Sequence, residues 1–104
     1  MGEVARLPCN LSVDTGDSIA LVLWYRNESD KPIYTIDARS IDLYKAEHSV
    51  ADPRRYKFNL SGLLYISPLL QSDGGEYRCR VDFKRGRTVN RILRLIVIGK
   101  FKKV

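Results

Sequence analysis

The chain has 104 residues, of which 44% are apolar and 29% charged, and its 18 Lys and Arg against 12 Asp and Glu give a formal net charge of +6. This length predicts one domain, and the composition excludes a disordered, collagen-like or low-complexity chain. No stretch approaches the roughly 18 apolar residues of a membrane span, and the basic balance favours either an acidic partner or simple solubility.

Short apolar segments separated by turns follow one another along the whole chain. No segment sustains a 3.6-residue period for three turns, so no helix is predicted, and the irregular stretch 41–52 holds at most one short strand. Seven or eight short strands with regular turns predict an all-β sandwich or barrel. The predicted strands cover 4–11, 19–26, 32–37, 55–60, 63–67, 76–83 and 89–98.

Two cysteines, one tryptophan and one tyrosine form the most specific pattern in the chain. Trp24 lies between Cys9 and Cys79, and Tyr77 stands two residues before Cys79 in the run Asp73-Gly74-Gly75-Glu76-Tyr77-Arg78-Cys79. The set resembles the immunoglobulin pattern, in which a disulfide joins two sheets, the Trp packs on it and the Tyr hydroxyl bonds the corner backbone. We therefore expect a Cys9–Cys79 disulfide across a loop of about 70 residues, worth roughly 4.4 kcal/mol, with Trp24 and Tyr77 in the core.

The distance between the cysteines leaves room for the extra strands C′ and C″, which favours a variable-type (V-type) immunoglobulin β-sandwich of two antiparallel sheets. Strand B would begin almost at the first residue, so strand A is expected to be missing. Residues 1–98 are expected to form the domain, and 99–104 a linker towards a next domain. Arg55, before strand D, is expected to form a bidentate pair with Asp73, the alternative being a solvated Arg54 or Arg55.

Three Asn-x-Ser sequons, at Asn10, Asn27 and Asn59, indicate a glycosylated, exported protein. The N-terminus lacks the basic and apolar segments of a signal peptide. We therefore expect a piece of a longer protein, the ectodomain of a plasma-membrane protein, with its signal upstream and its membrane segment downstream.

Catalysis is not predicted, and no cofactor is expected. His48 is the single histidine and has no nucleophile in a recognisable setting, and with no CxxC it makes no metal-ligand set. The acidic pairs are not placed in a cleft, and no Gly-rich loop could cradle a phosphate. Nucleic-acid binding would need a basic stripe interleaved with aromatic residues, and export argues against it.

The period of two along the strands predicts a binding face. If Val22 and Trp24 point inward, Leu23 and Tyr25 point outward, together with the residues that flank Cys79. This outer sheet face mixes apolar, aromatic and arginine side chains, a composition typical of protein interfaces. Shielding by a further strand or by glycans is the alternative. The orientation of Ile33, Tyr34 and Ile36 stays open.

Three sequence blocks carry a closer resemblance: Leu21-Val22-Leu23-Trp24-Tyr25-Arg26, then Pro32-Ile33-Tyr34-Thr35-Ile36-Asp37-Ala38-Arg39, then Tyr77-Arg78-Cys79-Arg80-Val81-Asp82-Phe83. With them, the chain from Cys9 to Ile98 resembles the first immunoglobulin domain of the Sidestep family, arthropod neuronal cell-surface receptors. The resemblance implies binding in trans to immunoglobulin-superfamily proteins of the Beaten path family, through the GFCC′ sheet, in adhesion and axon guidance. Its implied partner-binding residues are Leu23, Tyr25, Tyr34, Arg78, Arg80, Asp82 and Asn90.

Two other functions stay open at this point. One is homophilic or immune-type adhesion through the same face. The other is binding of an anionic glycan by two basic clusters, Lys84, Arg85 and Arg87 beside Lys100, Lys102 and Lys103.

Overall fold

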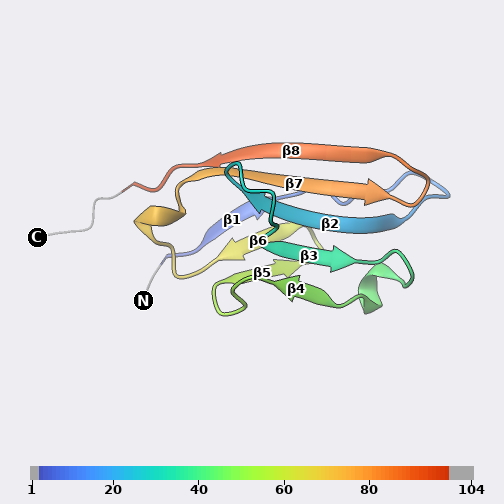
Figure 1. Ribbon diagram of the computed structural model, residues 1–104, viewed down its shortest axis with the longest axis horizontal. Coiled ribbons are helices and arrows are strands. Elements are labelled where there is room, and N and C mark those ends of the chain that lie inside the picture. Colours follow the sequence, from blue (N-terminus) through green and yellow to red (C-terminus); the bar gives the residue numbers. More distant parts are fainter. Residues whose placement is uncertain (1–2, 99–104) are drawn as a thin grey trace, which may run out of the picture.

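The computed structural model describes residues 3–98, which form two antiparallel sheets packed face to face (Figure 1). The smaller sheet has three strands, in the order β1 (Ala5–Pro8), β6 (Leu63–Ile66) and β5 (Tyr56–Asn59). The larger sheet has five, in the order β4 (His48–Val50), β3 (Tyr34–Asp37), β2 (Ile19–Arg26), β7 (Gly75–Phe83) and β8 (Thr88–Leu95). The predicted V-type sandwich is confirmed, with β3 and β4 as strands C′ and C″.

The N-terminal edge of the smaller sheet agrees with the expected lack of strand A. Within residues 3–98, β1 is the first strand and pairs only with β6, so its other edge has no neighbouring strand. The predicted linker at 99–104 lies outside the described residues.

Two short 3-10 helices connect strands, η1 (Leu43–Lys45) and η2 (Gln71–Asp73), and residues 3–98 contain no α-helix. The irregular stretch 41–52 holds one short strand, β4, as the sequence allowed, and also η1, which the sequence did not predict. The Asp42 side chain accepts a hydrogen bond from the Tyr44 backbone N–H and so caps η1.

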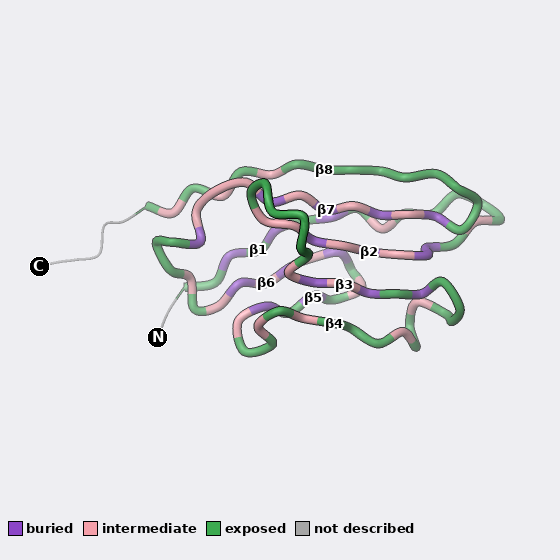
Figure 2. Tube along the Cα trace, viewed as in Figure 1, coloured by how far each residue is buried: buried purple, intermediate pink, exposed green. Residues whose placement is uncertain are grey.

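The core lies between the sheets and follows the period of two along the strands (Figure 2). Along β7 the residues Tyr77, Cys79 and Val81 are buried and alternate with half-exposed ones. The Cys9–Cys79 disulfide joins the two sheets, and Trp24 lies opposite Cys79 in the β2–β7 register. Both predictions about this centre are confirmed, because Trp24 is fully buried and contacts the edge of a second aromatic ring, that of Phe58.

The first strand also follows a period of two. Ala5, Leu7 and Cys9 are buried, whereas Val4 is exposed. The strict period of two in β1 places Ala5, and not Val4, on the same side as Leu7.

Candidate protein-binding face

The candidate site is the face of the five-stranded sheet that points away from the core, called here the outer face. Antiparallel pairing arranges its side chains in cross-strand rows, because directly paired residues point to the same side. In the middle row, Leu23 pairs with Thr35 on one side and Arg80 on the other. The outer face comprises Leu21, Leu23, Tyr25, Thr35, Asp37, Glu76, Arg78, Arg80, Asp82, Asn90, Ile92 and Arg94.

An aromatic row crosses this face from β2 to β8. Tyr25 pairs with Arg78, and Arg78 pairs with Ile92. The guanidinium carbon of Arg78 lies 4.5 Å from the centroid of the Tyr25 ring, a cation–π contact. Ile92 is 63% exposed although it is a large aliphatic residue. This row therefore presents an aromatic ring, a stacked guanidinium and an exposed aliphatic side chain to solvent.

The neighbouring ion pair holds a second arginine in place. Arg80 Nε and Nη2 donate to the two carboxylate oxygens of Asp82 at 2.9 and 3.0 Å, and Thr88 Oγ1 donates to the same carboxylate at 2.9 Å. The hydrogen bonds from Arg80 hold the pKa of Asp82 below its ordinary value, so the carboxylate stays ionised at neutral pH. The two-point contact orients the Arg80 side chain.

Formal charges nearly balance on the outer face. Its three arginines, Arg78, Arg80 and Arg94, stand against three acidic residues, Asp37, Asp82 and Glu76, although the chain as a whole carries +6. Arg39, beyond the end of β3, pairs with Asp37 at 2.6 Å and adds one positive charge at the edge of the face. Arg94 and Glu76 approach to 3.9 Å. Most of the excess positive charge therefore lies elsewhere on the molecule.

Six of the seven residues that the family resemblance assigns to partner binding lie together on the outer face, namely Leu23, Tyr25, Arg78, Arg80, Asp82 and Asn90. The prediction is wrong for the seventh residue, Tyr34. It is buried, its ring packs against Phe58, and its hydroxyl lies 2.6 Å from Nδ1 of His48. Because β3 turns Tyr34 and Ile36 inward, it is Thr35 that points outward. Burial also raises the pKa of Tyr34.

The resemblance did not assign Ile92 or Arg94, which belong to the same surface. Both stand on β8, Ile92 opposite Arg78 and Arg94 opposite Glu76. The alternation along 89–98 already predicts that both point outward. The signal that links Ile92 to Arg78 and Arg94 to Glu76 is the cross-strand register, which depends on the length of the turn between β7 and β8.

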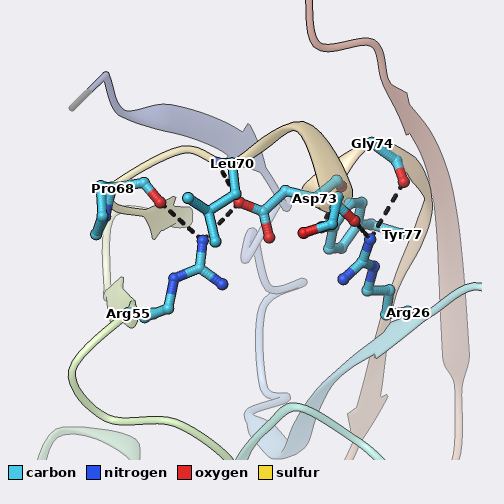
Figure 3. A network of polar contacts seen from close by, with 8 residues as sticks. Arg26, Arg55, Pro68, Leu70, Asp73, Gly74 and Tyr77 are labelled. Atoms are coloured by element: carbon cyan, nitrogen blue, oxygen red, sulfur yellow. Dashed lines mark hydrogen bonds and ion pairs between the residues drawn. The ribbon is translucent and has the colours of Figure 1, made fainter.

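A polar network at one end of the sandwich holds the corner before β7 (Figure 3). Arg55 Nη2 contacts Asp73 Oδ2 at 2.5 Å, which confirms the predicted pair. The expected bidentate geometry is wrong, because the same nitrogen also donates to the carbonyl oxygen of Pro68 at 2.7 Å. Asp73 Oδ2 accepts a second hydrogen bond from the Leu70 backbone N–H at 2.7 Å.

The predicted tyrosine corner is confirmed in the same region. The Tyr77 hydroxyl donates to the carbonyl oxygen of Asp73 at 2.6 Å, and the phenol ring is fully buried. Arg26 donates to the carbonyl oxygens of Ser72 and Gly74, with its guanidinium carbon 5.6 Å from the Tyr77 ring centroid. Burial raises the pKa of Tyr77 to about 12.

The raised pKa of Tyr77 predicts a loss of stability in alkali. The unfolded chain releases this proton near pH 10.0, whereas the folded state keeps it to about pH 12. The contribution is fully present below pH 10 and falls as the pH rises towards 12, by up to roughly 3 kcal/mol. Urea unfolding at pH 7, 9, 10 and 11 measures the decline, which should shrink in Tyr77→Phe and persist in the exposed control Tyr44→Phe. A stability that is level from pH 9 to 11 in the unaltered protein would contradict the assignment.

The three sequons lie on exposed turns and strand ends. Asn10 follows β1 and Asn59 ends β5, so both belong to the three-stranded side of the molecule. Asn27 follows β2 in a turn with a φ of 54°, and its Oδ1 accepts a hydrogen bond from the Glu76 backbone N–H. None of the three asparagines is an outer-face residue.

The basic turn between β7 and β8 is tied to the loop before β2. Arg87 Nη2 lies 3.6 Å from Asp14 Oδ2, and the Arg85 backbone N–H donates to Asp17 Oδ1. The second predicted basic cluster, Lys100, Lys102 and Lys103, lies outside the described residues. The proximity that was expected between the two clusters therefore stays a prediction.

Comparison with known families assigns the fold. Residues 1–98 match the model of the immunoglobulin V-set domain. The chain belongs to the immunoglobulin V-set family. The two sheets, the disulfide between them and the tyrosine corner are the physical features that this V-set domain shares with its family.

Solved structures of the same fold come from several proteins. The first Ig-like domain of human CD48 antigen superposes with a TM-score of 0.72 at 24% identity, covering 99% of this chain and 81% of that one. Murine CRIg has a TM-score of 0.69 at 21% identity, with coverages of 92% and 86%. The extracellular domains of the voltage-gated sodium channel beta4 subunit reach 0.69 at 24% identity, with coverages of 99% and 83%. No curated protein sequence matches the chain.

V-set domains are typical of cell-surface adhesion and recognition modules. They are typically extracellular, they commonly bind other immunoglobulin-superfamily proteins, and they are generally not enzymes. Within residues 3–98, no helix has the length and apolar character needed to cross a membrane.

Proposed function

We propose that this V-set domain is a cell-surface recognition module that binds another immunoglobulin-superfamily protein through its outer face. The observation that carries the proposal is the row formed by Tyr25, Arg78 and Ile92, in which an arginine stacks on an aromatic ring beside a 63% exposed isoleucine. Tyrosine and arginine are enriched among the residues that dominate binding energy at protein interfaces.

The order of this surface supports the same proposal. Arg78 is stacked and Arg80 is paired with Asp82, so neither long side chain has to be immobilised anew when a partner docks. Immobilising a flexible side chain at an interface costs about 0.5–1.5 kcal/mol. A preorganised pair of arginines next to half-exposed leucines therefore suits a protein partner.

Charge also separates this proposal from glycan binding. A polyanionic glycan would favour a surface with excess positive charge. The outer face is nearly charge-balanced, and the positive turn Lys84–Arg87 lies at its end, with Arg87 already paired to Asp14. The apolar and neutral centre of the outer face favours an immunoglobulin-type surface as its partner.

The sequence resemblance to the Sidestep family supports a specific partner and cellular setting. We propose that the domain belongs to the ectodomain of a neuronal plasma-membrane protein and binds a Beaten path protein in trans, in axon guidance. Carried to this structure, the contact is made by Leu23, Tyr25, Arg78, Arg80, Asp82 and Asn90, with Ile92 added from the register. Thr35 takes the outward position that the resemblance gave to Tyr34.

Glycosylation of the three sequons is compatible with this use of the outer face. Glycans on Asn10 and Asn59 would cover the three-stranded side, and a glycan on Asn27 would stand at the end of β2. Asn10 and Asn59 lie away from the aromatic row, whereas Asn27 is two residues beyond Tyr25, so a glycan there would stand beside one end of the row. Removal of one glycan mass in each of Asn10→Gln, Asn27→Gln and Asn59→Gln, measured on secreted protein, tests the assignment.

Binding to a panel of Beaten path ectodomains tests the function. We expect selective binding that falls by roughly 30-fold or more in Arg80→Glu and in Tyr25→Ala, the loss typical of a residue that dominates an interface. Lys57→Glu is the matched charge reversal on the outward side of β5, in the other sheet, and should bind as the unaltered domain does. Binding that survives both outer-face substitutions in folded protein would refute the site.

The same experiment distinguishes a homophilic function. The nearly neutral outer face does not repel a second copy of itself, and the sodium channel beta4 subunit, a protein of this fold, forms parallel homodimers that explain its role in cell-cell adhesion. Sedimentation of the domain over a range of concentrations would show dimerisation sensitive to Arg80→Glu if homophilic adhesion holds. A domain that stays monomeric and binds no Beaten path protein would overturn both proposed functions of the outer face, heterophilic binding of that family and homophilic adhesion.

A further inference from the structure

A second concave surface lies at the loop end of the sandwich, away from the outer face. It is a cleft of about 340 Å³ between the loop that precedes β2, the turn at η1 and the ends of the strands β5 and β7. In Figure 1 the loop before β2, η1 and the end of β7 lie at the end of the sandwich opposite the start of β1 and the end of β8. None of the outer-face residues lines it. Its volume is at the lower end of the range of small-molecule sites, which is roughly 300–1,000 Å³.

The floor of the cleft is apolar. Leu11, Leu43 and Leu60 line it and pack against the hydrophobic core, so their positions are set by the fold. At the rim, Val13 is 47% exposed and Tyr44 is 77% exposed. Large apolar groups left in water around a concave surface indicate a binding site for an apolar group.

Two carboxylates complete the lining, and the backbone orients both. Asp17 Oδ1 accepts hydrogen bonds from the backbone N–H groups of Ser18 at 2.8 Å and Arg85 at 3.1 Å. Asp42 Oδ1 accepts from the Tyr44 backbone N–H at 3.5 Å. In each carboxylate the second oxygen, Oδ2, takes no hydrogen bond from the described part of the chain.

The net formal charge of the cleft-lining residues is opposite in sign to that of the whole chain. Lys84 is the cation that lines the cleft, and within residues 3–98 it forms no ion pair with Asp17 or Asp42. Two carboxylates against one ammonium make the cleft a site of negative formal charge in a protein of +6. An apolar floor with anionic groups at its side selects a ligand with an apolar body and a positive charge.

We propose that this cleft binds a small organic ammonium compound with an aromatic or branched apolar body. The body would lie on Leu11, Leu43 and Leu60 against the Tyr44 ring, and the ammonium would be held between Asp17 and Asp42. A single lysine side chain of a partner protein would fill only part of the volume. The proposal does not depend on the function of the outer face, because the two surfaces share no residue.

Titration of the isotopically labelled chain with three matched compounds, followed by NMR, tests the proposal. The compounds are 4-phenylbutylammonium, 4-phenylbutanol and 4-phenylbutyrate, which share an apolar body and differ in charge. We expect the ammonium compound to bind roughly fivefold more tightly than the neutral alcohol, and the carboxylate most weakly. The shifted amides should be those of residues around Leu11, Leu43 and Leu60.

Three substitutions separate charge recognition from simple apolar adsorption. Asp17→Asn and Asp42→Asn keep the backbone-capping oxygen and should each remove most of the preference for the ammonium compound. Lys84→Gln should strengthen ammonium binding, and Arg80→Glu on the outer face should leave it unchanged. Equal affinities for the three compounds, no binding by any of them, or a preference that survives both Asp substitutions would overturn the proposal.

Discussion

Replacing Cys9 and Cys79 together with alanine is expected to lower the free energy of unfolding by about 4 kcal/mol. The disulfide closes a loop with a sequence separation of 70 between its ends, and opening that loop gives the unfolded chain more conformational entropy. Domains of this size are stable by only about 5–15 kcal/mol, so at least about a quarter of the stability depends on this bond. Urea unfolding of both proteins at neutral pH measures the difference.

The cysteine variant has a matched control. Reduction of the unaltered protein under denaturing conditions, followed by refolding in the presence of reductant, should give a similar loss, because it removes the same loop constraint. A double variant as stable as the oxidised protein would show that packing around Trp24, opposite Cys79, holds the two sheets together without the cross-link. Two alkylatable thiols in folded, non-reduced protein would contradict the bond itself.

Removal of the Asp73 carboxylate is expected to cost about 3 kcal/mol of stability and to lower the melting temperature by roughly 12 °C or more. Asp73 is 1% exposed and accepts hydrogen bonds from Arg55 and from the Leu70 backbone. Asp73→Ala therefore leaves the Leu70 N–H without its acceptor and leaves Arg55 with the Pro68 carbonyl oxygen but without a counter-ion. The corner would then be held by the Tyr77 hydroxyl bond to the Asp73 carbonyl oxygen and by the Arg26 bonds to Ser72 and Gly74. Calorimetric melting measures the shift.

Two further variants show which contact matters at this corner. Asp73→Asn keeps an oxygen for the Leu70 N–H but loses the negative charge, so its loss of stability should lie between those of the unaltered protein and Asp73→Ala. A double-mutant cycle with Arg55→Gln isolates the ion pair. Arg55 is 21% exposed at its side chain, so solvent screens part of the attraction, and a coupling of about 1 kcal/mol is expected. If Asp73→Ala loses about 3 kcal/mol of stability and the cycle shows no coupling between Asp73 and Arg55, the effect comes from the hydrogen bond of the Leu70 N–H.

Periodicity predicted most of this fold because each strand has one buried side. In β7, Tyr77, Cys79 and Val81 alternate with Arg78 and Arg80, and this alternation predicts which side chains enter the core. The outward positions of β2 and β8 followed by the same reasoning. Where the pattern was short or mixed, it failed. The run Ile33-Tyr34-Thr35-Ile36 has apolar residues of both parities, so the orientation of Tyr34 could not be read from it.

The sequence by itself determined the strand order along the chain, the disulfide, the buried Trp24 and Tyr77, and the outward set on β7, because these depend on local alternation and on an exact cysteine-to-tyrosine spacing. Only the tertiary structure decided which outward residues meet. The pairing of Tyr25 with Arg78 and Ile92, the single-nitrogen contact of Arg55 with Asp73, and the cleft between Leu11, Leu43 and Leu60 join segments far apart in the chain. Such contacts depend on register and on loop paths, which the whole packed sandwich sets and no local pattern encodes.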